Sequence, residues 1–229
     1  MHLKPEKTMK INRKKFFTVH AIAVVMLTVF LLSPPVWSES RSVTDYLRET
    51  LNQIIKVLND QSLKTPDKKN ERKEILLTLI KKRFDEQAFA RRALGAHWRE
   101  RTNEERQEFV NVFSDLLESS YVDKIDSYLV KAGSFSEKNI RYLNETVKGK
   151  YVIVSTKILT SNDAEIPVLY LFKNKQDNWL VCDVAIEGVS IAKNYRAQFK
   201  EILAKSTFAE LIDKLKAKEQ KEVTEKKNN

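Results

Sequence analysis

The sequence predicts a single-domain α+β fold, in which helices cover an antiparallel sheet of four strands. Three observations support this prediction. Apolar residues recur at helical spacing from about residue 42, they alternate at strand spacing between about residues 139 and 187, and the helical spacing returns after Gly188. No shift in composition divides these regions. A chain of about 190 residues is long enough for one core that buries roughly 70% of the surface exposed on unfolding.

The first 38 residues are predicted to be a cleaved signal peptide. Six of the 41 Lys and Arg residues lie in the first fifteen positions, and an apolar stretch from Phe16 to Leu32 follows them. Pro34 and Pro35 end that stretch, and Val36 and Ser38 suit positions −3 and −1 of a cleavage site. The stretch is shorter than the about 20 residues of a usual membrane span, so cleavage after Ser38 is favoured over a retained anchor.

Four helices are predicted ahead of the sheet, over about residues 42–59, 66–84, 86–94 and 102–129. Thr65 and Pro66 form an N-cap and first-turn pattern for the second helix, and Asp85 is placed to cap the third. Thr102 and Glu105 have the spacing of a capping box at the start of the fourth helix.

Four strands are predicted over about residues 139–147, 150–160, 165–173 and 178–187, because these runs are rich in β-branched and aromatic residues and short turns separate them. Apolar residues occupy both faces: Val152 and Val154 alternate with Ile153, for example. Such a sheet must be covered on both faces, or must line a cavity on one.

Two helices follow Gly188 and end near Leu215. The domain is therefore placed at residues 39–217. Residues 218–229 are rich in Lys and Glu, and we expect a charged flexible tail there.

Composition excludes several classes of function. Half of the formal charge of +10 lies in the signal segment, and the remaining charges alternate in sign along helices, which argues against nucleic-acid binding. One Cys and four Gly leave no disulfide framework and no glycine-rich phosphate loop. His97 is the only histidine after residue 38, and there is no GxSxG motif, so neither a multi-histidine metal site nor a serine hydrolase is favoured. No cofactor is expected.

Several segments resemble one known family. They are Phe84-Asp85, Ala90 to Gly95 with Trp98, the helix from Thr102 to Tyr121 with Phe109 and Phe113, Trp179 with Asp183, Glu187-Gly188-Val189-Ser190, and Asn194-Tyr195-Arg196. Through them the chain resembles the MlaC family of periplasmic phospholipid-binding proteins, which serve an ABC transport system, also linked to toluene tolerance, that maintains outer-membrane lipid asymmetry. Cys182 departs from the family pattern, in which an aromatic residue is expected. We interpret it as a buried small apolar residue.

The resemblance implies a cone-like fold enclosing an apolar pocket for acyl chains. We expect this pocket to be lined by Val152, Val154, Val168, Tyr170, Val184, Phe109, Phe113 and Tyr195, each of which is otherwise a plain core residue. Arg91 and Arg92 are candidates for headgroup contact, or else are solvated or in salt bridges. Gly188 is a candidate hinge, or else a tight turn.

The leading hypothesis is a monomeric periplasmic shuttle that carries phospholipid between an inner-membrane ABC transporter complex and an outer-membrane lipoprotein and porin complex. One alternative is a hydrolase that acts on a lipid or a cell-wall fragment in the same cavity. Others are a carrier of a hopanoid-related lipid and an interaction module without a ligand.

Overall fold

The structure is a computed structural model, and it describes residues 41–122, 135–160, 164–176 and 178–227. Residues from Arg41 onward form one compact unit. The predicted signal peptide lies outside the described residues, as does the predicted continuation of the fourth helix from residue 123 to 129. Within the described ranges, no helix combines the length and the apolar character that crossing a membrane requires.

The helices ahead of the sheet are α2 (Val43–Asn59), α3 (Lys69–Arg83), α4 (Glu86–Leu94) and α5 (Asn103–Leu117), as the sequence predicts. Asp85 caps α4 by accepting a hydrogen bond from the Ala88 backbone N–H at 3.0 Å. Thr102 and Glu105 form the predicted reciprocal capping box of α5.

Thr65 and Pro66 take the predicted N-cap and first positions, but of a 3₁₀ turn rather than of α3. Pro66–Lys68 forms a 3₁₀ turn, α3 begins only at Lys69, and the Thr65 side chain makes no capping hydrogen bond. A proline at the first position suits a 3₁₀ turn as well as an α-helix, so the sequence pattern did not distinguish the two.

The described strands form an antiparallel sheet in sequence order, which confirms the predicted meander and adds one strand to it. They are β1 (Ile140–Lys148), β2 (Tyr151–Leu159), β3 (Glu165–Lys175), β4 (Asn178–Ile186) and β5 (Val189–Ser190). The fifth strand has only two residues, so it carries no alternation that a sequence pattern could detect. It folds back on β4 through Glu187 and Gly188, whose φ angles of 51° and 82° suit a two-residue hairpin turn.

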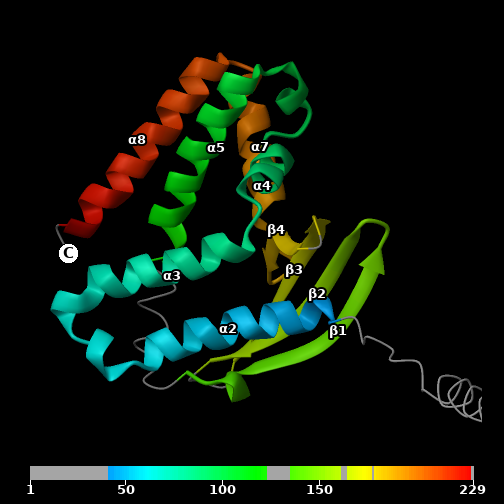
Figure 1. The fold of residues 1–229 in the computed structure, drawn as a ribbon. Helices are drawn as coiled ribbons and strands as arrows, with labels where there is room; N and C mark the ends of the chain where they lie inside the picture. The colour runs from blue at the N-terminus through cyan, green and yellow to red at the C-terminus, as the bar shows by residue number, and fades with distance from the viewer. Residues whose placement is uncertain (1–40, 123–134, 161–163, 177, 228–229) are drawn as a thin grey trace, which may run out of the picture. The chain divides into compact units, whose positions relative to one another are not determined.

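A first apolar core lies between α2 and one face of the sheet (Figure 1). It contains Val43, Leu47, Val152, Val154, Phe172 and Val181. The opposite face is only partly covered, because Leu169 on that face is 38% exposed. Lys157 and Lys173 lie on the same face, and their aliphatic stems are suited to covering part of the apolar surface between them.

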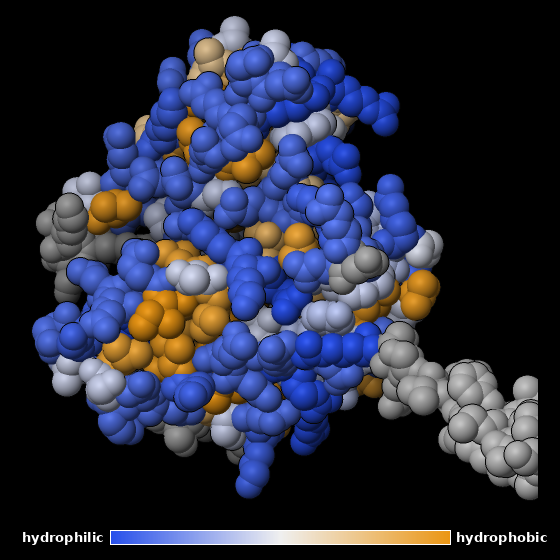
Figure 2. Space-filling view, in the orientation of Figure 1, coloured by the Kyte–Doolittle hydropathy of each residue, from blue (hydrophilic) through white to orange (hydrophobic). Residues whose placement is uncertain are grey.

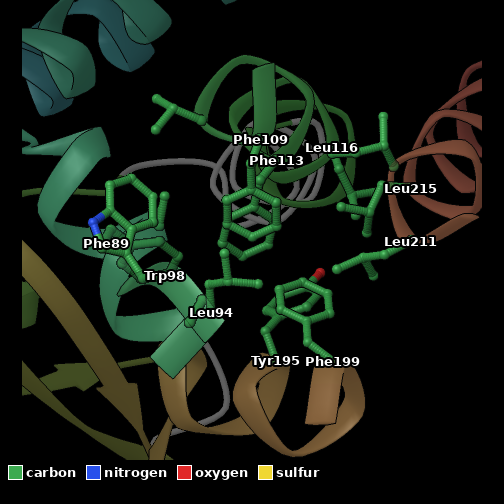
Figure 3. Close-up of a cluster of buried hydrophobic side chains, with 14 of the residues drawn as sticks. Phe89, Leu94, Trp98, Phe109, Phe113, Leu116, Tyr195, Phe199, Leu211 and Leu215 are labelled. Atoms are coloured by element: carbon green, nitrogen blue, oxygen red, sulfur yellow. The ribbon is translucent and has the colours of Figure 1, made fainter. Parts of the chain in front are cut away.

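A second apolar core is made by α4, α5, α7 (Ile191–Leu203) and α8 (Phe208–Lys227). Figure 3 shows its centre, where the rings of Phe109 and Phe113 lie above those of Tyr195 and Phe199. The ring centroids of Phe109 and Phe113 are 5.4 Å apart, and those of Phe113 and Tyr195 are 4.9 Å apart. Such aromatic pairs contribute about 0.5–1.5 kcal/mol each beyond the area that they bury.

Helix α8 continues to Lys227, into the segment for which the sequence predicts a charged flexible tail. The Ser120 hydroxyl donates a hydrogen bond of 2.6 Å to the Glu222 carboxylate, which links the later part of α8 to the end of α5. Lys and Glu are also good helix formers, so a segment rich in them extends a helix that is already anchored.

The second core is attached to the sheet through Asp183, a buried residue of β4. Its carboxylate accepts hydrogen bonds from the Ser190 hydroxyl at 2.7 Å and the Ala192 backbone N–H at 3.2 Å. The Arg92 guanidinium of α4 lies 3.4 Å from the same carboxylate. One side chain thus holds β4, the start of α7 and α4 together.

We expect Asp183→Asn to lower the free energy of unfolding by about 2–4 kcal/mol. The amide keeps one acceptor but turns an N–H₂ group toward donors, and it removes the negative partner of Arg92. Urea denaturation of the mature protein measures the effect. Asp213→Asn, on an exposed site of α8, is the matched control. Equal stability of the two variants would contradict the role assigned to Asp183.

Candidate functional site

An apolar cavity of about 140 Å³ lies where the two cores meet. Its lining comes from α3, α4, α5, the turn after α5, β4 and the first residue of α7. The residues are Leu77, Ile80, Lys81, Phe84, Glu86, Phe89, Ser114, Leu117, Glu118, Tyr121, Val184 and Ile191. An apolar cavity of about 150 Å³ holds a ligand as small as benzene, so this cavity fits a short hydrocarbon segment.

Phe84 places the cavity between the cores, because its ring packs against both of them. The Phe84 and Phe89 ring centroids are 5.1 Å apart. Next to Phe84, the Asp85 backbone N–H donates a hydrogen bond of 2.8 Å to the Val181 carbonyl of β4. The passage from α3 to α4 is therefore fixed to the sheet, and it forms one wall of the cavity.

A π-helical turn, Glu118–Val122, forms another wall. Glu118 and Tyr121 of this turn line the cavity together with Leu117, the last residue of α5. π-Helical turns are rare, and they occur frequently at functional sites.

Charged groups gather on the cavity lining. Lys81 of α3 forms an ion pair with Glu118, and the hydrogen bond between them raises the Lys81 pKa. The pKa of Glu86 is also raised, chiefly because burial disfavours its charged form. The nearby carboxylates of Glu118, Asp115 and Asp85 add to that shift, and the Lys81 ammonium opposes it.

Helix α3 contributes both to the cavity lining and to apolar surface. Figure 2 shows apolar side chains gathered in the region of α2 and α3, with charged side chains around them. Ile54 and Ile55 of α2 and Leu79 and Ile80 of α3 are half-buried. Ile80 also lines the cavity, so α3 separates buried apolar space from apolar surface.

The structure divides the sequence-predicted pocket residues between one face of the sheet and the second core. Val152, Val154, Val168, Tyr170 and Val184 lie on the same face of the sheet, as their strand pairing shows. Phe109, Phe113 and Tyr195 pack together in the second core. Of these eight residues, Val184 lines the apolar cavity.

Sequence reasoning missed the contribution of α3, from which Leu77, Ile80 and Lys81 line the cavity. One signal was available. Leu76 and Leu77 are consecutive and both buried, and consecutive helix residues point in directions about 100° apart. An apolar pair of this kind indicates a helix that packs on two sides.

The two candidate headgroup residues are separated. Arg92 forms a salt bridge with Asp183, as one of the alternatives to headgroup contact predicts. Arg91 is exposed and lines a different, polar hollow. Gly188 has a positive φ angle that suits a tight turn, which is the alternative to a hinge at this residue.

Among the groups suited to covalent chemistry, the Ser114 hydroxyl lines the cavity, whereas His97 and Cys182 do not. The His97 ring Nδ1 lies 3.3 Å from Glu100, and His97 is not among the residues that line the cavity. Cys182 is buried, which confirms its interpretation as a small apolar residue, and burial raises its pKa to about 11. A thiol with such a pKa is almost entirely protonated at neutral pH.

Comparisons with known proteins agree on one family. The family model described as MlaC protein matches residues 48–217. A Haemophilus influenzae protein named intermembrane phospholipid transport system binding protein MlaC is 23% identical over 211 residues, which cover 90% of this chain and 93% of that protein.

A solved structure of the phospholipid-binding protein from Ralstonia solanacearum, in complex with a phospholipid, is similar in fold. The TM-score is 0.67 at 17% sequence identity, and the match covers 80% of this chain and 99% of that one.

We expect Glu86→Gln to raise the free energy of unfolding at pH 7. The Glu86 pKa is higher in the folded than in the unfolded protein, so its ionisation costs stability above the folded pKa. This cost disappears as the pH falls below the ordinary value of 4.5, where both states are protonated. Denaturant unfolding from pH 7 to pH 4 should therefore show the two proteins converging, whereas Glu201→Gln, at an exposed site of α7, should match the wild type at both ends. If the free energies of unfolding of the wild type and Glu86→Gln differ by a constant amount across this pH range, the raised pKa assigned to Glu86 is wrong.

Proposed function

The chain belongs to the MlaC family, and from this membership we propose that it is a phospholipid carrier. In this proposal it receives phospholipid from one membrane complex and delivers it to another across the periplasm. The partners would be an inner-membrane ABC transporter complex and an outer-membrane complex of a lipoprotein and a porin, and the transport would maintain lipid asymmetry. The proposal gives the protein no catalytic step.

The apolar cavity between the two cores is the observation that carries this proposal. Its lining is mostly aliphatic and aromatic, and its charged groups are those of Lys81, Glu86 and Glu118. An acyl chain in the cavity would leave water at a gain of about 0.8 kcal/mol per CH₂ group. The charged groups of the lining would then lie near the polar end of the lipid.

A phospholipid needs more space than the cavity has in this conformation. Widening past Val184 would lead to Tyr170, its partner on β3. Displacement of Phe89 would lead to Phe113, since their ring centroids are 5.7 Å apart. The residues predicted from the sequence would then form the second layer of the loaded pocket, and α3 is the element that would move aside.

The hydrolase alternative has less support. In the described structure, the Ser114 hydroxyl lines the cavity but His97 lies elsewhere, paired with Glu100. Lysolipid or another product that accumulates on incubation would favour the hydrolase, whereas intact stoichiometric lipid favours the carrier.

Export is part of the proposal. The basic segment, the apolar segment and the cleavage pattern ahead of Glu39 support a mature periplasmic protein that begins at that residue.

We expect Val184→Phe to reduce co-purified phospholipid several-fold, with little loss of stability. The larger ring would occupy the cavity at the point where it must widen. Mass spectrometry of an organic extract of the purified protein measures bound lipid per chain. Val147→Phe makes the same change on β1, at a side chain that is 70% exposed, and should keep its lipid. Full lipid occupancy in Val184→Phe would show that the lipid binds outside the apolar cavity.

We also expect the loaded protein to release lipid slowly into bare vesicles and faster into vesicles that carry the cognate inner-membrane transporter. Two acyl chains of about sixteen carbons correspond to a gross burial of about 25 kcal/mol, an upper limit that ordering and reorganisation reduce. Unassisted escape into water is therefore slow, and a partner would have to favour an open state. The lipid left on the protein is measured over time.

Rapid unloading into bare vesicles would contradict partner-gated release. The hinge proposed at Gly188 is tested in the same assay. A Cβ there would meet no atom within 4 Å, so Gly188→Val acts only through the backbone, whose φ of +82° it disfavours. Gly188→Asn, which tolerates positive φ better, is the control. Normal release by Gly188→Val would exclude the hinge at Gly188, but it would not contradict partner-gated release.

A further inference from the structure

A second hollow, of about 370 Å³, is polar and positively charged. Arg91 of α4, Arg106 of α5, and Lys173 and Lys175 of β3 contribute four cationic side chains to its lining. Asp85 is the carboxylate that faces them. Sites for small ligands are commonly about 300–1,000 Å³, so this volume is at the small end of that range.

The Asp85 carboxylate neutralises little of this charge. One of its oxygens accepts the capping hydrogen bond from the Ala88 N–H, and the Lys175 Nζ lies 4.0 Å from the same oxygen. Within the described part of the chain, neither Arg91 nor Lys173 has an ion-pair or hydrogen-bond partner for its side chain. Both are placed to bind an added anion without breaking an existing contact.

Arg106 is fixed in position at the other side of the hollow. Its Nε donates a hydrogen bond of 3.0 Å to the Trp98 carbonyl, and its guanidinium lies 5.6 Å from the centre of the Trp98 ring. A guanidinium that is already oriented loses less side-chain entropy when it binds an oxyanion. The carboxamides of Gln87, Asn103 and Gln107 line the same hollow and offer further N–H donors.

Helix α4 separates this hollow from the apolar cavity. Glu86 and Phe89 line the apolar cavity, whereas Gln87 and Arg91 line the basic hollow. Residues three apart share a face of a helix and adjacent residues do not, so the two spaces lie on different faces of α4. The basic hollow is therefore a separate space from the apolar cavity.

We propose that the basic hollow binds a phosphate-type oxyanion through Arg91, Arg106 and Lys173. A guanidinium pairs with such a group through two parallel N–H bonds, and an ammonium supplies a point charge beside it. The anion also relieves the repulsion between four cations that share one small space. The oxyanion is either a soluble phosphate compound or the phosphate of a lipid headgroup at a membrane surface.

Titration of the mature protein with inorganic phosphate and with pyrophosphate, at constant ionic strength, tests the proposal by calorimetry. Saturable binding that Arg91→Gln combined with Lys173→Gln weakens by roughly tenfold or more would support a site for soluble phosphate. Lys193→Gln combined with Lys200→Gln removes the same charge from exposed positions of α7, and should leave binding unchanged.

Flotation with vesicles distinguishes the two sources of phosphate. Binding to phosphatidylglycerol vesicles but not to phosphatidylcholine vesicles, lost only in the Arg91 and Lys173 variant, would assign the site to a headgroup. Co-purified phospholipid should stay unchanged in every variant, because the apolar cavity is not altered. The proposal is wrong if neither phosphate nor vesicles bind saturably, or if the α7 variant loses as much binding as the Arg91 and Lys173 variant.

Discussion

The Asp183 carboxylate lies buried on β4 and accepts hydrogen bonds from the segment that begins α7, while the Arg92 guanidinium of α4 lies beside it. A buried charge is stable only when it is paired and hydrogen-bonded, so these partners cannot be displaced at low cost. The aromatic core of α4, α5, α7 and α8 depends on this connection for its position over the sheet. The apolar cavity exists because the two cores meet at Phe84 and β4 without merging.

This division suits a carrier. A single close-packed core resists any change of volume, because each displaced side chain loses contacts with many neighbours. Two cores that meet at a limited boundary can separate there while each keeps its own packing. The charged groups of the cavity lining, Glu86 and the Lys81–Glu118 pair, lie along that boundary. Stability is thus concentrated within the cores, and the space between them is left for a ligand.

The helices and the four long strands could be predicted from the sequence, because each repeats its apolar pattern over several turns or residue pairs. The pocket could not. Phe109 and Phe113 have the same helical spacing whether they face a ligand or another helix. Only their tertiary contacts with Phe199 and Tyr195 show that they face another helix. The two-residue β5 is too short to leave a pattern.

A register shift explains a further difference on β4. The sequence alternates Leu180, Cys182 and Val184, which predicts one inward face. The pairing of β3 and β4 shifts between Leu171 and Phe172, and the three consecutive residues Val181, Cys182 and Asp183 are all buried. A bulge of this kind re-aims side chains, and it is what turns Asp183 toward α7. Strand β1 carries a similar shift between Tyr142 and Asn144, and it is an edge strand of the sheet that the described residues form. The edges of a sheet invite pairing between copies of a chain. The irregularity, together with the charged Arg141 and Lys148, makes this edge a poor template for another strand, so the same device that shapes the interior also protects the chain from aggregation.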